Sequence, residues 1–261
     1  MLTLQQIEQQ YPENIRAFKR GILREYLQYK ILEIIFSSEF ASKLSFMGGT
    51  VLRLVYGNTR FSEDLDFDNF GLTENEFNTL SLIIKKGLEA QGLKTEINTV
   101  AKGVFRCNIR LPEILFANQL SPFREEKILI QVDSFAQNFD YKPEKKNINK
   151  FDVFSEIFTT PPDVLLSQKI YAIFNRKRAK GRDFYDIVFL LSFAKPNYEY
   201  LQQKLNISSP DELKQKIALI CRELNFAELA KDAEPFLFSP QDSKKIKLFL
   251  DIVSSGVGQI I

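Results

Sequence analysis

The sequence predicts an α+β protein: a mixed sheet with flanking helices, followed by a C-terminal helical bundle. The order of the expected elements supports this fold class. Helical patterns come first, short strand and helix patterns mix over residues 44–133, and only helical patterns follow residue 160. We therefore expect two domains, residues 1–155 with the sheet and residues 156–261 with the bundle.

The N-terminal segment predicts two helices. Thr3 and Gln6 are spaced as a capping box at the start of a short helix over residues 3–11, which Pro12 ends. Apolar residues at helical spacing then predict a long amphipathic helix over residues 14–36.

A glycine-rich turn follows the first predicted strand. Apolar residues 44–47 lead into Gly48-Gly49-Thr50, and a short apolar helix then ends near Gly57. Glycine lets a backbone approach a phosphate closely, and amides at a helix N-terminus point outward with the positive end of the helix dipole. The turn therefore favours an anionic ligand such as a nucleotide phosphate, although such a turn also occurs without any ligand.

A row of carboxylates comes next. Asp64, Asp66 and Asp68 occupy alternate positions of a predicted strand, so their side chains share one face. Like charges repel, so the row is unfavourable unless a cation or water lies in front of it. The first and last side chains lie about 13 Å apart along an extended strand. The spacing from the glycines favours Asp64 and Asp66 as metal ligands, and a solvated strand end is the plain alternative.

The rest of the first domain is predicted to add one helix and further strands. Thr73 and Glu76 form a second capping box, and the helix that they begin should end at Gly92. Residues 112–126 are expected to be a loop, and residues 138–158 a connection to the second domain. Strands are predicted over residues 94–100, 104–111 and 127–133, the last of them central.

Two helices of the second domain carry polar residues of interest. Residues 160–163 are a strong helix start, with proline tolerated in the first turn, and this helix carries Lys169 among apolar neighbours. Another helix begins after Gly181 and places Asp183 and Asp186 on one face. Further helices are predicted over residues 197–205, 209–224 and 240–254.

The composition excludes several kinds of chemistry. The 261 residues include no histidine, which excludes Ser-His-Asp and Cys-His nucleophiles, His-ligated zinc and histidine-dependent ribonucleases. Cys107 and Cys221 lie far apart and are expected to be reduced, buried thiols. No stretch approaches the roughly 20 apolar residues that span a bilayer, and the N-terminus lacks a signal-peptide pattern. We therefore expect a cytoplasmic protein with no membrane partner.

Basic residues gather in two places. Residues 175–182 hold five basic groups, and Lys142, Lys145, Lys146 and Lys150 form a looser group. Either group can contact RNA phosphates, and either can be an ordinary solvated surface. The sequence leaves both interpretations open.

The glycine turn and the aspartate row together resemble a known signature. Gly48-Gly49-Thr50, thirteen residues and Asp64-x-Asp66 are similar to the motif of the polymerase-beta-like nucleotidyltransferase superfamily. With the run from Arg60 to Phe67 they resemble the AbiEii/AbiGii toxin family, which includes the MenT toxins of type IV toxin–antitoxin systems. Lys169 in an LLxxK pattern and the R-D-x-Y-D segment from Arg182 to Asp186 resemble the second signature of that family. The resemblance covers residues from about 44 to 190.

The resemblance implies a polymerase-beta-like core with a metal site. Asp64 and Asp66 would bind Mg²⁺, with Mn²⁺ as an alternative, in front of the triphosphate of an NTP substrate. Asp133, at the end of the strand over residues 127–133, would be the third acidic ligand and catalytic residue. A strand-end aspartate that starts a turn is the plain alternative for Asp133.

The resemblance also implies nucleotide contacts. Gly48, Gly49 and Thr50 would hold phosphates, and Ser62 would touch phosphate or only brace the strand. Lys169 would act in catalysis by neutralising triphosphate charge, or it is a surface lysine. Asp186 would face the nucleotide, and Arg182 and Asp183 are accessory candidates that can instead clamp the helix to its domain.

The implied function is enzymatic. A nucleoside monophosphate would move from an NTP to an acceptor hydroxyl, with the 3′ end of tRNA as the leading acceptor. The protein would then be a toxin with a cognate antitoxin encoded nearby. Transfer to a protein or a small molecule is an alternative, because one metal site can serve many acceptors. An NTP-binding module without catalysis is another, whereas a phosphate-loop NTPase is disfavoured because no GxxxxGK[ST] stretch occurs.

Overall fold

The computed structural model describes residues 1–255, apart from the side chains of residues 101 and 102. The chain divides into two units. The first comprises Met1–Gly57 and Phe61–Thr160, and the second comprises Asn58–Arg60 and the chain from Pro161 onward. The segment Asn58–Arg60 thus belongs to the second unit, although in sequence it lies between two elements of the first.

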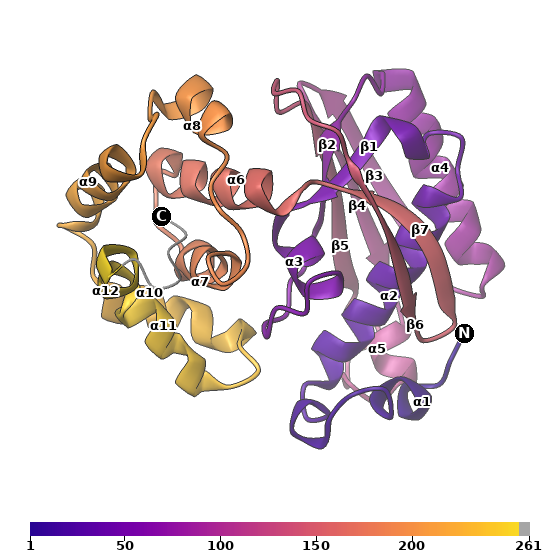
Figure 1. Cartoon of the computed structure of the whole chain (residues 1–261). Coiled ribbons are helices and arrows are strands. Elements are labelled where there is room, and N and C mark those ends of the chain that lie inside the picture. Colours follow the sequence, from indigo (N-terminus) through magenta and orange to yellow (C-terminus); the bar gives the residue numbers. More distant parts are fainter. Residues whose placement is uncertain (256–261) are drawn as a thin grey trace. The chain divides into compact units, whose positions relative to one another are not determined.

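The first unit is built on a seven-stranded mixed sheet (Figure 1). The strands lie in the order β3-β4-β5-β2-β1-β7-β6. β5 is parallel to β2 and β1 is parallel to β7, whereas the other neighbouring pairs are antiparallel. This sheet confirms the predicted α+β class. The strands are β1 (Leu44–Met47), β2 (Leu65–Asn69), β3 (Glu96–Lys102), β4 (Val104–Leu111), β5 (Ile128–Phe135), β6 (Glu144–Lys150) and β7 (Val153–Thr159).

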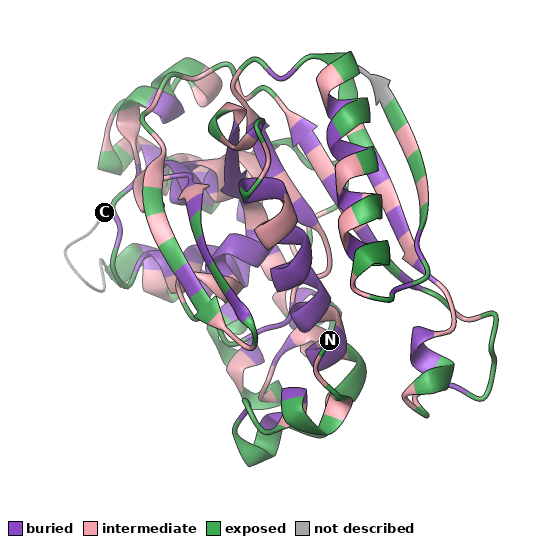
Figure 2. Ribbon diagram, turned by 90° about the vertical axis from the view of Figure 1, so that its right-hand side faces the viewer, coloured by how far each residue is buried: buried purple, intermediate pink, exposed green. Residues whose placement is uncertain are grey.

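Among the helices of the first unit, α2 packs against one face of the sheet. Both predicted capping boxes form, at Thr3 and at Thr73. Phe36 of α2 lies 6.1 Å from Phe67 of β2 between ring centroids, so α2 packs on the side of β2 opposite the aspartates. Figure 2 shows α2 buried over most of its length. The helices are α1 (Leu4–Glu8), α2 (Lys19–Phe36), α3 (Gly48–Leu54), α4 (Glu74–Ala90) and α5 (Ile114–Ala117).

The prediction of a connection over residues 138–158 is wrong, because this segment contains the β6–β7 hairpin. Among the seven residues of β6, all of them described, Ile148 alone is buried, so the strand has almost no apolar alternation. The turn also lacks glycine, since Phe151 itself adopts a φ of 61°. Its ring contacts Tyr26 and Tyr29 at centroid distances of 5.2 and 5.4 Å. Packing from α2 therefore holds a turn that local sequence does not indicate.

The second unit is helical, as predicted for a bundle. Phe184 lies at its centre, with ring centroids 4.9 Å from Phe249 and 5.4 Å from Phe226. The helix predicted over residues 240–254 is divided into a 3₁₀ turn and two short helices, and α10 was not predicted. The helices are α6 (Pro162–Asn175), α7 (Gly181–Leu190), α8 (Tyr198–Leu205), α9 (Pro210–Cys221), α10 (Phe226–Ala233), α11 (Lys244–Lys247) and α12 (Phe249–Ser255).

Both cysteines are free and buried, as expected. Burial raises the pKa of the Cys221 thiol to about 11. Among residues 1–255, no helix has the length and apolarity needed to cross a membrane.

Candidate active site

One row of residues crosses four neighbouring strands of the sheet. Arg106 of β4 pairs with Asp133 of β5, Asp133 pairs with Asp66 of β2, and Asp66 pairs with Met47 of β1. Residues paired in this way project from the same face, and neighbouring strands lie about 4.8 Å apart. Two of the three aspartates predicted to bind metal, Asp66 and Asp133, are therefore neighbours, with Arg106 next in the row.

Gly48 lies directly against the Asp66 carboxylate. Its φ is 79°, a left-handed conformation, and a Cβ atom added there would lie 2.3 Å from Asp66 Oδ2. No side chain fits at that distance, so both the conformation and the space require glycine. The strand β1 can thus end and α3 begin immediately beside the carboxylate.

Asp64 immediately precedes β2 and is fixed by two contacts. Its Oδ1 accepts a hydrogen bond from the Gln131 amide at 3.3 Å, and its backbone carbonyl accepts one from the buried Thr50 hydroxyl. Burial raises the pKa of the Asp64 carboxyl; the Gln131 hydrogen bond opposes this shift, and the charges of Glu63 and Asp133 add to it. Since the Thr50 hydroxyl is engaged, Thr50 would offer a phosphate its backbone amide.

Asp133 is held by Arg106 in a bidentate ion pair. Arg106 Nε donates to Oδ1 at 2.9 Å, and the other guanidinium nitrogen donates to Oδ2 at 2.6 Å. The hydrogen bonds and charge of Asp133 raise the pKa of Arg106, and the charges of Asp64 and Asp66 add to the shift. Arg106 is thus paired with Asp133 and adds positive charge near Asp64 and Asp66.

The donor set suits a divalent cation. Carboxylate oxygens are the ligands that Mg²⁺ prefers, and Arg106 already places a positive charge among Asp64, Asp66 and Asp133. As the side chains stand, no three acidic or cysteine side chains in the described part of the chain are close enough to hold a metal. Both oxygens of Asp133 are engaged by Arg106 in this arrangement.

Asp68, the last carboxylate of the row, has a separate environment. It is 2% exposed, and its Oδ1 accepts a hydrogen bond from the Gln137 amide at 2.8 Å. Burial raises the pKa of Tyr141, and the charge of Asp68 raises it further. These contacts hold Asp68 inside the fold, and metal binding by Asp64 and Asp66 stays a prediction.

Ser62 belongs to a segment that α2 holds through the backbone. The buried Gln28 side chain donates to the carbonyl of Ser62 at 3.0 Å and to that of Glu63 at 2.9 Å. Ser62 itself is partly exposed. The segment before Asp64 is therefore fixed to α2.

The second unit brings Lys169, Asp183 and Asp186 together. Lys169 Nζ lies 2.9 Å from Asp186 Oδ2 and 3.3 Å from Asp183 Oδ1. Burial alone would lower the pKa of Lys169, but the two carboxylates outweigh it and hold the pKa above its ordinary value. The lysine charge is thus balanced within the second unit.

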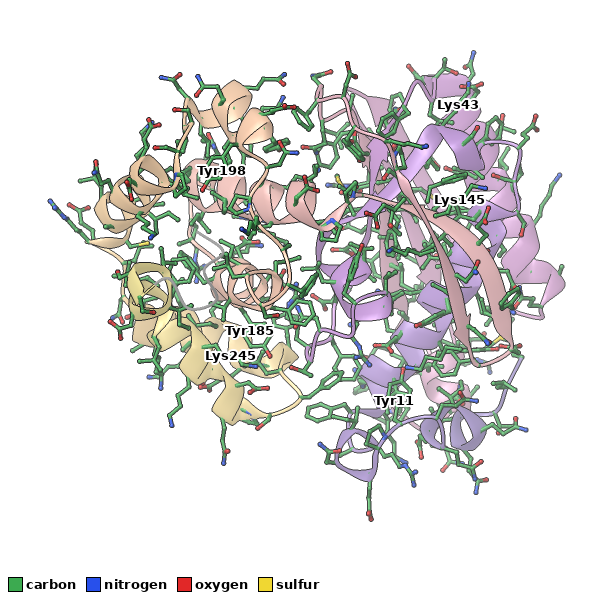
Figure 3. All side chains as sticks on the ribbon, viewed as in Figure 1. Tyr11, Lys43, Lys145, Tyr185, Tyr198 and Lys245 are labelled. Atoms are coloured by element: carbon green, nitrogen blue, oxygen red, sulfur yellow. The ribbon has the colours of Figure 1, made fainter. Side chains whose placement is uncertain are left out.

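Arg60 completes this cluster from a distant part of the sequence. Its guanidinium donates to Asp186 at 2.7 and 2.6 Å, and Asn58 Nδ2 donates to the same carboxylate at 2.9 Å. Thr59 shares a hydrogen bond of 2.8 Å with Tyr185, which Figure 3 shows beside Lys245. These contacts explain why the segment Asn58–Arg60 is part of the second unit.

Comparisons with known proteins show the family of the chain. A family model described as nucleotidyl transferase AbiEii toxin, type IV toxin–antitoxin system, matches residues 30–252. The chain belongs to the AbiEii family. It is therefore a nucleotidyltransferase, and the match extends well beyond the residues on which the sequence resemblance rested. A search of curated proteins finds no match.

Solved structures share the fold of this AbiEii-family protein. JHP933 from Helicobacter pylori superposes with a TM-score of 0.57 at 17% identity, over 92% of this chain and 94% of that chain. A structure described as a putative nucleotidyltransferase from H. pylori gives 0.57 at 16% identity, over 93% and 98%. The likeness shows a common fold over 92% and 93% of this chain, respectively.

The two basic groups have different surroundings in the AbiEii-family structure. Lys150 Nζ lies 2.9 Å from the buried Glu25 and 3.9 Å from the centroid of the Tyr11 ring, so it serves the fold. Lys145 and Lys146 form surface ion pairs with acidic neighbours. By contrast, the loop between α6 and α7 has exposed cations along residues 176–180.

Three contacts of the site were not predicted from the sequence. Arg60 is part of the quoted motif, but nothing local indicates Asp186 as its partner. Arg106 is an exposed arginine on a strand, which has many ordinary explanations, and Gln28 belongs to a helix predicted only as packing.

Arg182, an accessory candidate, lies with its guanidinium carbon 4.0 Å from the centroid of the Phe236 ring.

Proposed function

We propose that this AbiEii-family enzyme transfers a nucleoside monophosphate from an NTP to a hydroxyl of RNA, with the 3′ end of tRNA as the leading acceptor. The observation that carries the proposal is the pairing of Asp66 with Asp133, with Gly48 packed against Asp66. It gives the family signature a carboxylate pair beside the glycine turn.

Each candidate site residue of the first unit has a role in this proposal. Asp64, Asp66 and Asp133 would hold Mg²⁺, which when bound neutralises charge on the triphosphate and on the leaving oxygen. The backbone amides from Gly48 to Thr50 would donate to phosphate oxygens. The Asp133 carboxylate would accept the proton of the attacking hydroxyl, and Ser62 would position the strand.

The residues of the second unit remain candidates from sequence resemblance. Lys169, Asp183 and Asp186 form one buried ion-pair cluster, and Arg182 stacks on a phenylalanine ring. We propose that Lys169 and Asp186 act in nucleotide binding, with Arg182 and Asp183 as accessories. Exchange of Lys169 for methionine should then raise the KM for NTP, whereas a purely structural Lys169 would lower the melting temperature and leave the KM unchanged.

The exposed basic loop supports an RNA acceptor. Lys177, Arg178 and Lys180 are exposed within a few residues of one another between α6 and α7. Such a group attracts a phosphate backbone with an affinity that falls as salt rises. A cognate antitoxin and a cytoplasmic location are part of the same proposal, since the family is that of type IV toxins.

The test is transfer of label from each α-labelled NTP in the presence of Mg²⁺ or Mn²⁺ and total RNA. We expect label in tRNA-sized RNA with the intact protein and none with Asp66→Ala. Label in a protein band or a small molecule would refute the RNA acceptor and leave nucleotidyl transfer standing. NTP binding without incorporation into any acceptor would favour the binding module.

A further inference from the structure

We propose that Arg106 is a resident counter-ion that occupies Asp133 until metal and nucleotide arrive together. This inference rests on the proposed metal site, and it adds an order of loading to it. Arg106 lies next to Asp133 in the row across the sheet, on the side away from Asp66. Its fork engages both oxygens of Asp133 at 2.9 and 2.6 Å. A metal at Asp133 therefore competes with this arginine for the carboxylate.

The ion pair of Arg106 with Asp133 is exposed enough for a metal ion to take the place of the arginine. Asp133 is 13% exposed, whereas the Arg106 side chain is 46% exposed and reaches its partner from the solvent side. An ion pair of this exposure is worth little in free energy, so a stronger cation can replace it. The buried pair of Arg60 with Asp186, at 3% and 0% exposure, has no such freedom. The difference in burial separates an exchangeable pair from a permanent one.

Nucleotide should favour the exchange. Three carboxylates without a cation repel one another, and Arg106 relieves that repulsion in the free protein. A triphosphate brings phosphate oxygens, which a guanidinium binds as well as it binds a carboxylate. Arg106 can then leave Asp133 for the triphosphate while the metal takes Asp133. Metal and NTP would therefore bind with positive coupling, and metal alone would bind weakly.

The experiment measures Mn²⁺ binding to the nucleotide-free protein by the electron paramagnetic resonance signal of free Mn²⁺. Arg106→Gln should bind Mn²⁺ about five- to tenfold more tightly than the intact protein, from the loss of one half-exposed ion pair and its charge. Arg110→Gln is the matched control, because Arg110 lies on the same strand and face but pairs with Leu129. It should change the affinity less than twofold.

A double-mutant cycle with Asp133→Asn tests the route of the effect. If Arg106 acts by holding Asp133, the gain from Arg106→Gln should shrink to less than twofold when Asp133 is already asparagine. An equal gain in both backgrounds would overturn the inference, since the arginine would then act only as a nearby charge. No gain over Arg110→Gln would overturn it as well.

Repeating the titration with a non-hydrolysable NTP analogue tests the coupling. The analogue should tighten Mn²⁺ binding to the intact protein more than to Arg106→Gln, and an equal effect on both would contradict the proposed order. Arg106→Lys keeps the charge but loses the bidentate geometry, so its Mn²⁺ affinity should lie between those of the intact protein and Arg106→Gln. It replaces Arg106→Gln as the test variant if that variant folds poorly. Failure of the metal site itself looks different: Mn²⁺ would then bind no better to the intact protein than to Asp66→Asn, with or without the analogue.

Discussion

Arg60 and Asp186, 126 residues apart in sequence, form a bidentate ion pair that is buried from both sides. The nitrogen–oxygen distances are 2.7 and 2.6 Å, and the side chains are 3% and 0% exposed. Removing one partner of such a pair leaves a buried charge uncompensated, which destabilises far more than the loss of a surface pair. The pair therefore fixes the segment Asn58–Arg60 in the second unit.

Exchange of Arg60 for methionine should lower the free energy of unfolding by about 3–5 kcal/mol. Lys145→Met is the control, because Lys145 and its partner Glu156 are 62% and 53% exposed, and it should cost less than about 1 kcal/mol. Urea unfolding followed by circular dichroism measures both. Equal losses for the two variants would show that burial of the Arg60 pair does not set its contribution.

The same cluster makes stability depend on pH. Burial alone would raise the pKa of Asp186, but Arg60 and Lys169 outweigh it and hold the pKa below the ordinary 3.8. The unfolded chain then binds protons first as the pH falls. This contribution is therefore fully present above about pH 4 and is lost as the pH drops through the lower, folded pKa. Lys169, with its pKa above 10.5, contributes below that pH and loses its contribution as the pH rises through the folded value.

The expected result is a urea midpoint that falls steeply below pH 4 in the intact protein. In Asp186→Asn, the whole curve should be lower and the acid decline shallower, because one of the groups that titrates differently on folding is gone. Midpoints measured between pH 3 and pH 7 give the two slopes. Parallel slopes would show that other carboxylates, such as Glu25, account for the acid sensitivity.

Gly48 and Gly57 offer a matched pair for testing the closeness of the turn to Asp66. Both have φ near 80°, but an added Cβ at Gly48 meets Asp66 whereas one at Gly57 meets nothing within 4 Å. Each alanine variant carries backbone strain of about 1–2 kcal/mol. Only Gly48→Ala should also displace the carboxylate, and misplacing a catalytic group by about 1 Å costs roughly 100-fold in rate. Label incorporation together with melting temperature separates the effects, and an equal loss of activity in Gly57→Ala would attribute it to strain.

Asp66 and Asp68 share a face but should differ in their roles. Asp66→Asn should abolish transfer, since it removes a charged ligand of the proposed metal. Asp68→Asn should keep turnover within about threefold and lower stability by about 1 kcal/mol, because Asp68 accepts the Gln137 amide inside the fold. Initial rates and thermal melts of both variants are the measurement. A loss of activity in Asp68→Asn as deep as that in Asp66→Asn would move the metal site along the strand.

Local patterns predicted the frame of this site well. The alternation in β2 placed Leu65 and Phe67 on the buried face and the aspartates on the other, because period two is a property of any extended chain. Capping boxes at Thr3 and Thr73 fixed two helix starts, because each depends on two side chains only three residues apart. Strand alternation and capping boxes can be read from the sequence because all the residues that define them lie within a few positions of one another.

Long-range pairings were not predictable in this way. The alignment of Arg106 with Asp133 and Asp66 depends on the order and register of three strands, which no one of them encodes alone. Thr50 was expected to hold phosphate, and its hydroxyl donates to the carbonyl of Asp64, fourteen residues on. The turn at Phe151 forms because aromatic rings of α2 receive it. Each of these contacts depends on a partner that the local pattern does not name.

The membership of Asn58–Arg60 in the second unit has a consequence for how the chain can be divided. A fragment starting at Pro161 would contain all the helices described for that unit, and yet Asp186 would lack the guanidinium that neutralises it. On the ribosome, Arg60 is made long before Asp186, so the second unit stays incomplete until α7 can receive a segment synthesised earlier. Splitting the gene at residue 160 would place Arg60 and Asp186 on separate chains. Co-expression of both halves would be needed to restore the ion pair.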